Sequence, residues 1–182
     1  IYLSPRALMD GHSAIRGGVP ICFPQFNQRG PLPKHGFVRN LAWQPNSPPE
    51  AQSNELAMVL HDSDATRAFW PHLFRAELRV SLQPGSLRMT LTVDNTGSPP
   101  WSFAAALHTY LRVDDVADVR LEGLQGANRW DAVRDDRHVE MAPALHFDGE
   151  FDSVYTSAVD GLRLVQPSAT LEIRQSASCT ET

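Results

Sequence analysis

Two arginines in the first third of the chain have the chemistry that a phosphate group requires. Arg16 precedes Gly17-Gly18, and Arg39 ends the run that begins at His35. A guanidinium group donates two parallel hydrogen bonds to two oxygens, which suits a phosphate dianion. Arginines that only form surface ion pairs are the commoner case, and local sequence does not separate the two readings. The glycines form neither a GxGxxG nor a GxxxxGK(S/T) motif, so they do not indicate a nucleotide-binding loop.

A histidine and an aspartate further along the chain offer proton transfer. His108 follows the apolar run Trp101 to Leu107, where it is either a core histidine or an acid or base at the mouth of a cleft. Asp152 stands where an apolar strand begins, and its alternative reading is an aspartate of a turn or strand edge. Other acidic residues are numerous, and periodicity does not rank them.

Metal and nucleophile chemistry have little support in the sequence. The seven histidines form no i, i+4 pair and no HExxH motif, and the two cysteines, Cys22 and Cys179, form no CxxC pair. No G-x-S-x-G elbow is present, and neither cysteine has the features of a nucleophile. The residues themselves therefore give little support for a zinc site.

Alternating hydrophobicity predicts the element that should anchor these residues. Apolar side chains recur at every second position from Ala76 to Leu82 and again from Leu87 to Val93, on both sides of the turn Gln83 to Ser86. This pattern predicts a β-hairpin with one buried face. Shorter strands are expected at four places: Ile1 to Ser4, Val116 to Leu124, Leu162 to Val165 and Thr170 to Arg174. The apolar run Trp101 to Leu107 is also expected to be a strand.

The remaining segments predict loops and one helical turn. A turn of helix is expected from Asp64 to Trp70, with Asp64 as its cap and Pro71 as its stop. The polar segment Pro45 to Asn54 indicates a surface loop. Ala14 to Trp43 is rich in Gly, Pro and aromatic residues without a period, which is typical of a loop that lines a binding site. Many short strands with frequent turns predict an all-β sandwich forming a single domain over residues 1–182.

Composition narrows the class of protein. Hydrophobic residues make up 42% of the chain and charged residues 20%, as in a folded globular protein. The net charge of -5 argues against a general nucleic-acid binder. No apolar run is long enough to cross a membrane. With few cysteines, a reducing cytoplasm and a monomeric, soluble protein are the expectation.

Five motifs in order resemble one family. Ala14 to Phe26 (AIRGGVPICFPQF) is followed by Leu32 to Asn40 (LPKHGFVRN), and then by the later pieces FWPH, LHTY and DSVY, which begin at Phe69, Leu107 and Asp152. Together these pieces resemble the hexose-6-phosphate mutarotases, which are related to aldose 1-epimerases. The resemblance runs from near the start of the chain to about Arg174.

The resemblance implies a galactose-mutarotase-like antiparallel β-sandwich, the supersandwich, that needs no metal or coenzyme. It implies interconversion of the α and β anomers of glucose 6-phosphate and related hexose 6-phosphates. Matched position by position, Arg16 and Arg39 would bind substrate and phosphate, and His35 would line the pocket. His108 would be the catalytic acid and Asp152 an active-site aspartate.

The chain departs from the family near its end. The family's base is a glutamate in a C-x-E motif, and Cys179-Thr180-Glu181 resembles that motif but follows Asp152 too closely. Either residues are absent between Ser178 and Cys179 or just before, with a spatial break there, or the C-terminus is truncated and its ending resembles the motif by chance; we expect the first. Flanking strands are also expected to be absent before Ile1. Glu181 is then the expected base. Two alternatives stay open: a sugar-phosphate-binding sandwich without a base, and an epimerase of neutral sugars, which would not need the paired arginines.

Overall fold

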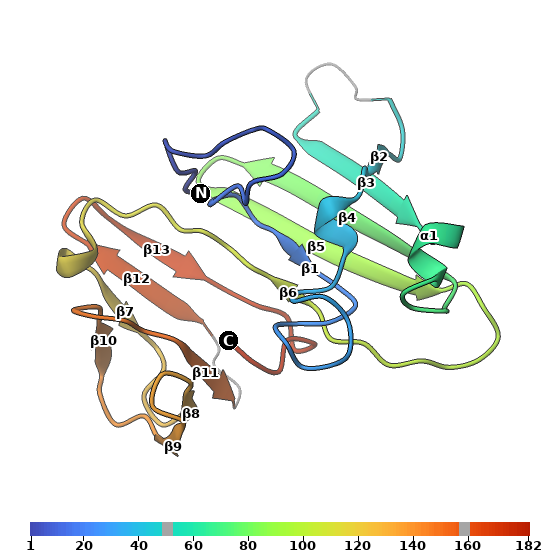
Figure 1. The fold of residues 1–182 in the computed structure, drawn as a ribbon. Helices are drawn as coiled ribbons and strands as arrows, with labels where there is room; N and C mark the ends of the chain where they lie inside the picture. Colours follow the sequence, from blue (N-terminus) through green and yellow to red (C-terminus); the bar gives the residue numbers. More distant parts are fainter. Residues whose placement is uncertain (49–52, 157–160) are drawn as a thin grey trace. The chain divides into compact units, whose positions relative to one another are not determined.

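The fold is described from a computed structural model, which places residues 1–48, 53–156 and 161–182 (Figure 1). These residues form two compact units, one of Leu3–Tyr110 with Ile1 and one of Leu111–Thr182 with Tyr2. Every pair of strands among them is antiparallel, and helix is limited to three short turns. The all-β prediction is therefore confirmed.

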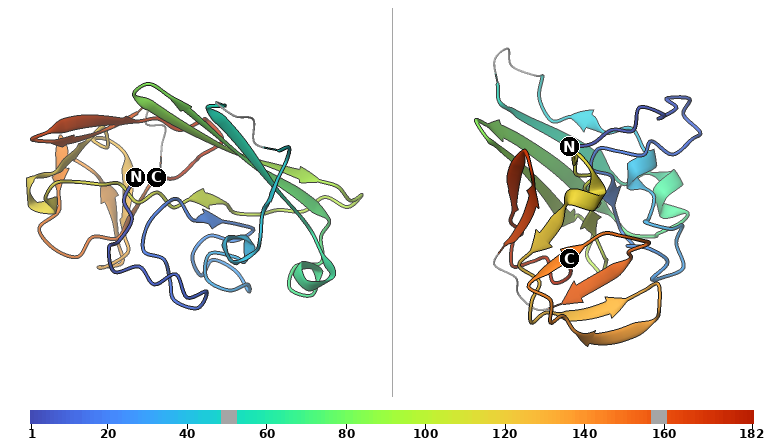
Figure 2. Two further views of the ribbon diagram at one scale, coloured as in Figure 1. Left: turned by 90° about the horizontal axis from the view of Figure 1, so that it is seen from above. Right: turned by 90° about the vertical axis from the view of Figure 1, so that its left-hand side faces the viewer.

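The first unit holds one four-stranded sheet, one two-stranded ladder and two helical turns. The sheet has the order β2-β3-β4-β5, and the ladder pairs β1 with β6. Figure 2 shows β3, β4 and β5 lying side by side as long strands. The bounds are β1 Ile21–Cys22, β2 Gln44–Pro45, β3 Glu55–His61, β4 Phe74–Gln83, β5 Ser86–Asn95, β6 Ala106–Leu107, η1 Val38–Asn40 and α1 Asp64–Arg67.

The β4–β5 hairpin confirms the strongest sequence prediction. Its register runs from Phe74 opposite Asn95 to Gln83 opposite Ser86. Because successive side chains of a strand alternate between faces, one face of the hairpin is apolar and the other polar. Phe74 and Ala76 are buried on the apolar face, where they join Phe23 and Val38 from the irregular segment in one core.

The predicted helical turn exists, but its cap was assigned one residue too late. The N-cap is Ser63, whose side chain accepts a hydrogen bond from the Thr66 amide while the Thr66 hydroxyl accepts from the Ser63 amide. This is a capping box, in which a threonine takes the position usual for Glu or Gln. Asp64 is the first helical residue instead and forms an ion pair with Arg67.

The ends of the first unit differ from expectation in detail. Ile1 to Ser4 form no strand, because only a single bridge joins Leu3 to Gly17. The expected strand Trp101 to Leu107 is reduced to β6. Of the expected loop Pro45 to Asn54, Pro45 belongs to β2, residues 46–48 and 53–54 are exposed, and residues 49–52 lie outside the described part of the chain.

The second unit holds two small antiparallel sheets, of order β10-β7-β12-β13 and β11-β8-β9. Its core gathers Leu124, Ala127, Leu145, Tyr155 and Leu162. The bounds are β7 Arg120–Glu122, β8 Asn128–Asp131, β9 Asp136–Val139, β10 Ala144–His146, β11 Ser153–Thr156, β12 Leu162–Gln166, β13 Ala169–Ile173 and η2 Val116–Asp118.

Three strand predictions in this unit have different outcomes. The predicted strands Leu162 to Val165 and Thr170 to Arg174 are confirmed, within a residue, as β12 and β13. Val116 to Leu124 is a strand only over β7. Its first part is the turn η2, because the Asp115 side chain caps the Ala117 amide and so favours a turn over an extended chain.

Candidate functional site

A backbone ladder longer than β1 and β6 positions His108. The Ala104 amide donates to the Pro24 carbonyl (2.9 Å), the His108 amide to Pro20 (3.0 Å) and the Tyr110 amide to Gly18 (3.0 Å). These bonds continue the antiparallel register of Ile21 with Leu107 and Cys22 with Ala106. The hydrogen-bonded backbone therefore extends beyond the two residues of β6, and it fixes the position of the His108 backbone.

Alternation along this ladder places His108 on the side away from the core. Ile21 and Phe23 enter the core on one side, so His108 and Tyr110 belong to the other side. The His108 and Tyr110 rings are 5.2 Å apart, and His108 is exposed. The alternative reading of His108 as a core histidine is therefore wrong.

Gly36 brings the His35 loop against this ladder. The Gly36 backbone bridges Phe23 in parallel orientation, and a Cβ added to Gly36 would lie 2.0 Å from the Phe23 carbonyl oxygen. Gly36 also has a φ of 70°, a conformation that L side chains rarely adopt. Only glycine fits there, and its close approach places the His35 ring 5.8 Å from the His108 ring.

The hydrogen bonds of His35 fix how its ring is oriented. Its Nδ1 accepts a hydrogen bond from the Asn27 amide (3.2 Å), and the His35 amide donates to the Asn27 carbonyl (3.0 Å). Burial lowers the pKa of His35, and the positive charges of Arg39, His108 and Lys34 lower it further. The half-buried His35 is thus biased toward the neutral form.

Arg39 lies next to His35, whereas Arg16 does not contact either histidine. Arg39 is exposed in the turn η1 and donates through Nη2 to the Lys34 carbonyl (3.1 Å). Its charge also opposes the burial that raises the pKa of the Cys22 thiol. The Arg16 carbonyl accepts from the Ser4 amide (2.9 Å), and within the described residues its exposed side chain forms no hydrogen bond or ion pair.

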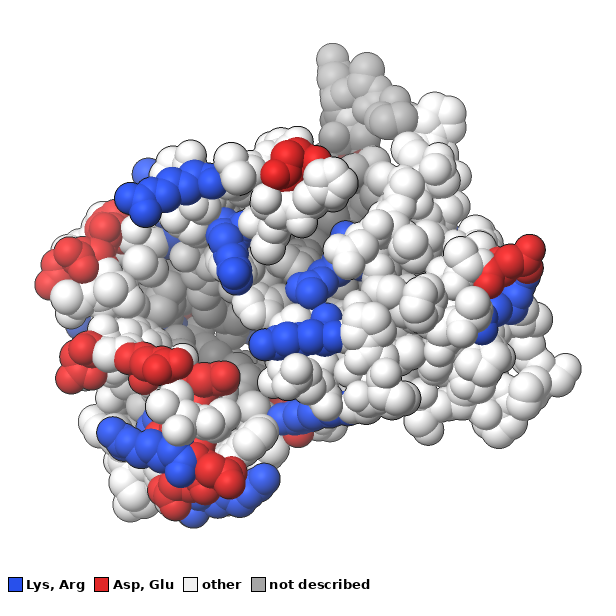
Figure 3. Space-filling model, in the orientation of Figure 1, with Lys and Arg blue, Asp and Glu red and all other residues white. Residues whose placement is uncertain are grey.

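The segment that carries these residues is unusually basic. Residues 1–43 contain five Lys or Arg and a single acidic residue, Asp10, in a chain whose net charge is -5. Figure 3 shows Lys and Arg side chains near the middle of the view with few acidic neighbours, whereas charges of both signs interleave over β8 and β9 at the lower left. A local excess of positive charge of this kind favours an anionic ligand.

Asp152 and Glu181 are both attached to β11, in the second unit. Asp152 immediately precedes β11, and its carbonyl accepts from the Ala132 amide (2.9 Å). Glu181 forms an antiparallel bridge with Thr156 at the other end of the strand. Asp152 and Thr156 are four residues apart along the strand, which corresponds to about 13 Å. The two exposed carboxylates are therefore fixed at opposite ends of one short strand.

A network of ion pairs around Arg129 packs against β11. Arg129 donates to Ser153 Oγ (3.0 Å), Glu140 (3.1 Å) and Asp131 (3.3 Å), and its guanidinium lies 4.9 Å from the centre of the Phe151 ring. Burial raises the pKa of the neighbouring Tyr155 to about 12. The network holds the strand that carries Asp152 and faces Glu181.

The chain does not have the spatial break that was expected between Ser178 and Cys179. The Cys179 amide donates to the Ser176 carbonyl (2.9 Å), which closes a turn over residues 176–179. The Thr182 and Tyr155 amides then donate to each other's carbonyls (3.0 and 2.8 Å). A four-residue turn at residues 176–179 lies between β13 and the Glu181 segment.

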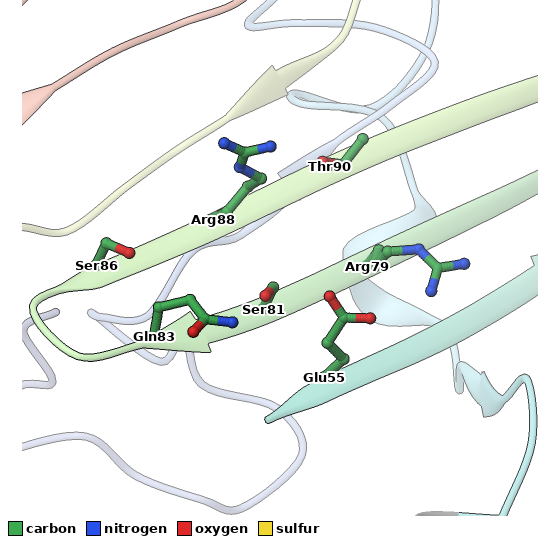
Figure 4. A pocket seen from close by; sticks show the side chains of 7 residues that line it. All are labelled: Glu55, Arg79, Ser81, Gln83, Ser86, Arg88 and Thr90. Atoms are coloured by element: carbon green, nitrogen blue, oxygen red, sulfur yellow. The ribbon is translucent and has the colours of Figure 1, made fainter. Parts of the chain in front are cut away.

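A separate hollow of about 400 Å³ lies on the polar face of β3, β4 and β5 (Figure 4). It contains none of the predicted site residues and no histidine. Its lining residues are Glu55, Arg79, Ser81, Gln83, Ser86, Arg88 and Thr90. Because it offers no group that exchanges protons near neutral pH, we do not assign the chemistry to it.

Sequence reasoning missed the residues that hold His35 and flank His108. Tyr110 lies two residues after His108, so the period of two in a strand was a usable signal for its position. Asn27 acts through its backbone and Gln25 through a loop contact seven residues away in sequence, at Leu32. No local pattern marks either one.

Two further observations concern binding partners. Within residues 1–48, 53–156 and 161–182, no three His, Cys, Asp or Glu side chains are grouped so that they could hold a metal ion. No helix in this described part is long and apolar enough to cross a membrane.

Comparisons with known proteins point to one family. A family model described as aldose 1-epimerase matches residues 2–181. A protein of Cenchrus ciliaris named "Putative glucose-6-phosphate 1-epimerase" is 37% identical over 175 residues, which cover 91% of this chain and 53% of that protein. A protein of the same name from Escherichia coli (strain K12) is 36% identical over 167 residues, covering 88% and 54%. The chain spans about half the length of these curated relatives.

Solved structures agree with the fold. The crystal structure of a putative mutarotase (YeaD) from Salmonella typhimurium superposes with a TM-score of 0.78 at 32% identity, covering 91% of this chain and 55% of that one. A galactose mutarotase related enzyme from Lactobacillus acidophilus gives a TM-score of 0.71 at 16% identity, covering 85% and 60%. The second likeness concerns the fold alone, and both agree with the predicted galactose-mutarotase-like architecture.

Proposed function

The chain belongs to the aldose 1-epimerase family, and we propose that it interconverts the α and β anomers of a hexose 6-phosphate. The observation that carries this proposal is the exposed His108 beside the half-buried His35, which belongs to a basic segment of an otherwise acidic chain. Relatives named as glucose-6-phosphate 1-epimerases support the substrate class.

The proposed reaction needs one acid and one base. The His108 imidazolium gives its proton to the ring oxygen while a carboxylate takes the proton of the anomeric hydroxyl. The bond between C1 and the ring oxygen breaks, and the electron pair of the former O–H bond forms the aldehyde. Rotation about C1–C2 and closure on the other face reverse both transfers, so the two groups regain their starting states. Each acid or base contributes on the order of a hundredfold or more.

The other residues are proposed to bind. Arg16 and Arg39 hold the phosphate, so that energy from a group remote from C1 orients the reacting carbon. His35 lines the sugar pocket beside His108. Glu181 is the proposed base and Asp152 a ligand for a sugar hydroxyl. Because about 13 Å of strand separates their attachment points, these two carboxylates have different partners on the sugar.

The test of the acid is the rate of anomer exchange, measured by NMR exchange spectroscopy after subtraction of the spontaneous rate. We expect His108→Asn to fold as the wild type does and to lose most of the catalysed exchange, about a hundredfold or more. His61→Asn is the matched control, because His61 is also exposed in the first unit but lies in β3. Equal loss in both variants, or none in His108→Asn, would overturn the assignment.

The test of the phosphate site compares glucose with glucose 6-phosphate. Arg39→Ala should raise the KM for glucose 6-phosphate about tenfold or more and leave exchange of glucose unchanged, because a charge-assisted bidentate pair is lost. Arg88→Ala is the control, since Arg88 lines the hollow of Figure 4. Equal rates for the two sugars in the wild type would contradict the phosphate proposal, and a larger effect of Arg88→Ala would move the site to that hollow.

The base decides between the enzyme and a binding protein. Glu181→Gln should abolish catalysed exchange while glucose 6-phosphate still binds, with Glu150→Gln as the control because Glu150 is an exposed carboxylate of the same unit. If the wild type binds glucose 6-phosphate but does not accelerate exchange, the chain is a sugar-phosphate-binding sandwich without a base.

A further inference from the structure

The amide of Asn27 determines which nitrogen of the His35 ring carries the proton. A backbone N–H only donates, so Nδ1 of His35, which receives this bond at 3.2 Å, must present its lone pair. A proton on Nδ1 would set two N–H groups against each other. The neutral ring therefore carries its hydrogen on Nε2, on the edge of the ring away from Asn27.

Gln25 holds Asn27 in place. Gln25 is buried, and its amide nitrogen donates to the carbonyls of Asn27 and Leu32 (both 3.1 Å). Its amide oxygen accepts from the Leu32 amide (2.9 Å). The Asn27 carbonyl thus receives Gln25 Nε2 and the His35 amide together. The buried, uncharged Gln25 side chain thus hydrogen-bonds to both ends of the loop, at Asn27 and Leu32, and so orients the Asn27 amide.

The loop accepts backbone conformations that need this support. Asn27 has a φ of 52° and His35 a φ of 69°, both in the left-handed region. Such conformations cost free energy in residues other than glycine and persist only where the surroundings fix them. Gly36, which lacks the Cβ that would clash with Phe23, lets the loop end approach Phe23 closely. The position of the His35 ring is therefore strongly determined.

Charges around His35 favour the same neutral state. Arg39 follows it in η1, Lys34 precedes it, and His108 faces it from the ladder, with ring centres 5.8 Å apart. Phe26, whose ring is 5.3 Å from that of His35, is itself covered by the Arg29 guanidinium. A positive charge on His35 would be repelled by Arg39, His108 and Lys34.

We propose that Gln25 and Asn27 lock His35 as a neutral hydrogen-bond donor through Nε2–H, and that His108 alone is the imidazole that exchanges its proton during turnover. Gln25 is then a positioning residue. His35 gives the substrate a neutral hydrogen-bond donor, while His108 supplies the proton that is exchanged. This division of roles rests on the proposed function, but the tautomer of His35 does not.

The tautomer is tested on the ligand-free protein by long-range ¹H–¹⁵N NMR of the imidazole rings. Signals of His35, His108 and His61 are assigned by their loss in single Asn variants. We expect His35 to show an unprotonated Nδ1 and a protonated Nε2, and to stay in this neutral form at about pH 6.5, the ordinary pKa of a histidine. A protonated Nδ1 in the wild type, or a His35 ring that is half protonated at that pH, would overturn the proposal.

The role of Gln25 is tested with Gln25→Met, which keeps the volume and removes the three hydrogen bonds. We expect His35 in this variant to populate both tautomers and to titrate closer to an ordinary histidine. Gln28→Met is the control, because Gln28 is exposed in the same loop. If Gln25→Met unfolds the loop, Gln25→Asn serves as the second variant. An unchanged His35 spectrum in a folded Gln25 variant would refute the part assigned to Gln25.

Kinetics separate this proposal from the proposed function. The pH profile of kcat/KM should show a single imidazole step, and His35→Asn should raise KM about tenfold with little change in that profile. Titration of two imidazoles in the wild-type profile would overturn the division of roles. If no exchange is catalysed at all, the proposed function fails while the NMR result on His35 still stands or falls alone.

Discussion

The two units fix their candidate residues by opposite means. In the first unit, His35 and Arg39 are positioned by a buried amide side chain, Gln25, and by the close backbone approach of Gly36. In the second, Asp152 and the strand that faces Glu181 are supported by the buried charges of Arg129 and Glu140. One scaffold is uncharged and the other is ionic.

This difference follows from what each region must leave available. Carboxylates packed beside Arg16, Lys34 and Arg39 would pair with these cations and weaken their attraction for an anion, whereas in this segment hydrogen bonds between neutral groups position the loop. In the second unit the charges of Arg129, Asp131 and Glu140 compensate each other. They stabilise the fold and leave the exposed carboxylates outside the network.

The largest expected effect breaks the uncharged scaffold. Gly36→Ala would place a Cβ 2.0 Å from the Phe23 carbonyl oxygen at a φ of 70°, so the loop must leave β1. We expect a loss of about 4 kcal/mol in the free energy of unfolding, measured by urea denaturation. Gly85→Ala is the control, because Gly85 has a φ of 74° but no atom near its Cβ, and should cost about 1 kcal/mol. Equal costs would mean that the close approach to Phe23 is unimportant.

The next effect breaks the ionic scaffold. Arg129→Met leaves the Glu140 carboxylate buried without its cation, because methionine fills the space but carries no charge. We expect a loss of about 3 kcal/mol in the free energy of unfolding, and faster hydrogen exchange of the amides of β8 and β11. Arg174→Met is the control, since Arg174 pairs with Glu172 at the surface and such pairs contribute about 0.5 kcal/mol. Similar costs for the two variants would show that the network is not structural.

The same contrast explains how much could be predicted from sequence. The hairpin from β4 to β5 and the strands β12 and β13 follow from alternation, a local signal. The motifs around Arg16, His35, Arg39 and His108 indicated a family and its site without showing how the site is built. The contacts of Gln25 and Gly36 join residues that no periodic pattern relates, so the supports of His35 could not be predicted.

The second unit was harder to predict for a physical reason. Strands β7 to β11 are three or four residues long, too short to show a period against their neighbours. The turn η2 replaced a predicted strand because one aspartate, Asp115, competes for a backbone amide. The cap of α1 moved to Ser63 because a hydroxyl that pairs with Thr66 satisfies two amides, whereas Asp64 was judged alone. Short-range hydrogen bonds of this kind override composition.

The smallest expected effect is a difference between the two units in the pH below which each loses stability. The pKa of His35 is lowered in the folded protein, so the unfolded chain binds a proton first as the pH falls below about 6.5, and the loop loses stability from there downward. Burial raises the pKa of Glu140, but the Ala142 amide, Arg129 and Tyr155 together lower it below its usual range, so its contribution is lost only as the pH falls below about 4.5. As the pH falls, amide hydrogen exchange should therefore become faster first in the first unit and only later in the second.

We expect amides of the loop around Asn27 to begin to lose protection as the pH falls below about 6.5, while those of β8 and β11 keep theirs until the pH falls below about 4.5. The variant His35→Gln sharpens the comparison, because a neutral side chain of similar reach removes the first step and leaves the second unchanged. In Arg129→Met we expect the second step to be lost and the first to be unchanged. The pKa of Glu140 then rises, and its protonation no longer destabilises the fold. Simultaneous loss of protection in both units of the wild type would contradict the separation, because it would mean that a single titration governs both scaffolds.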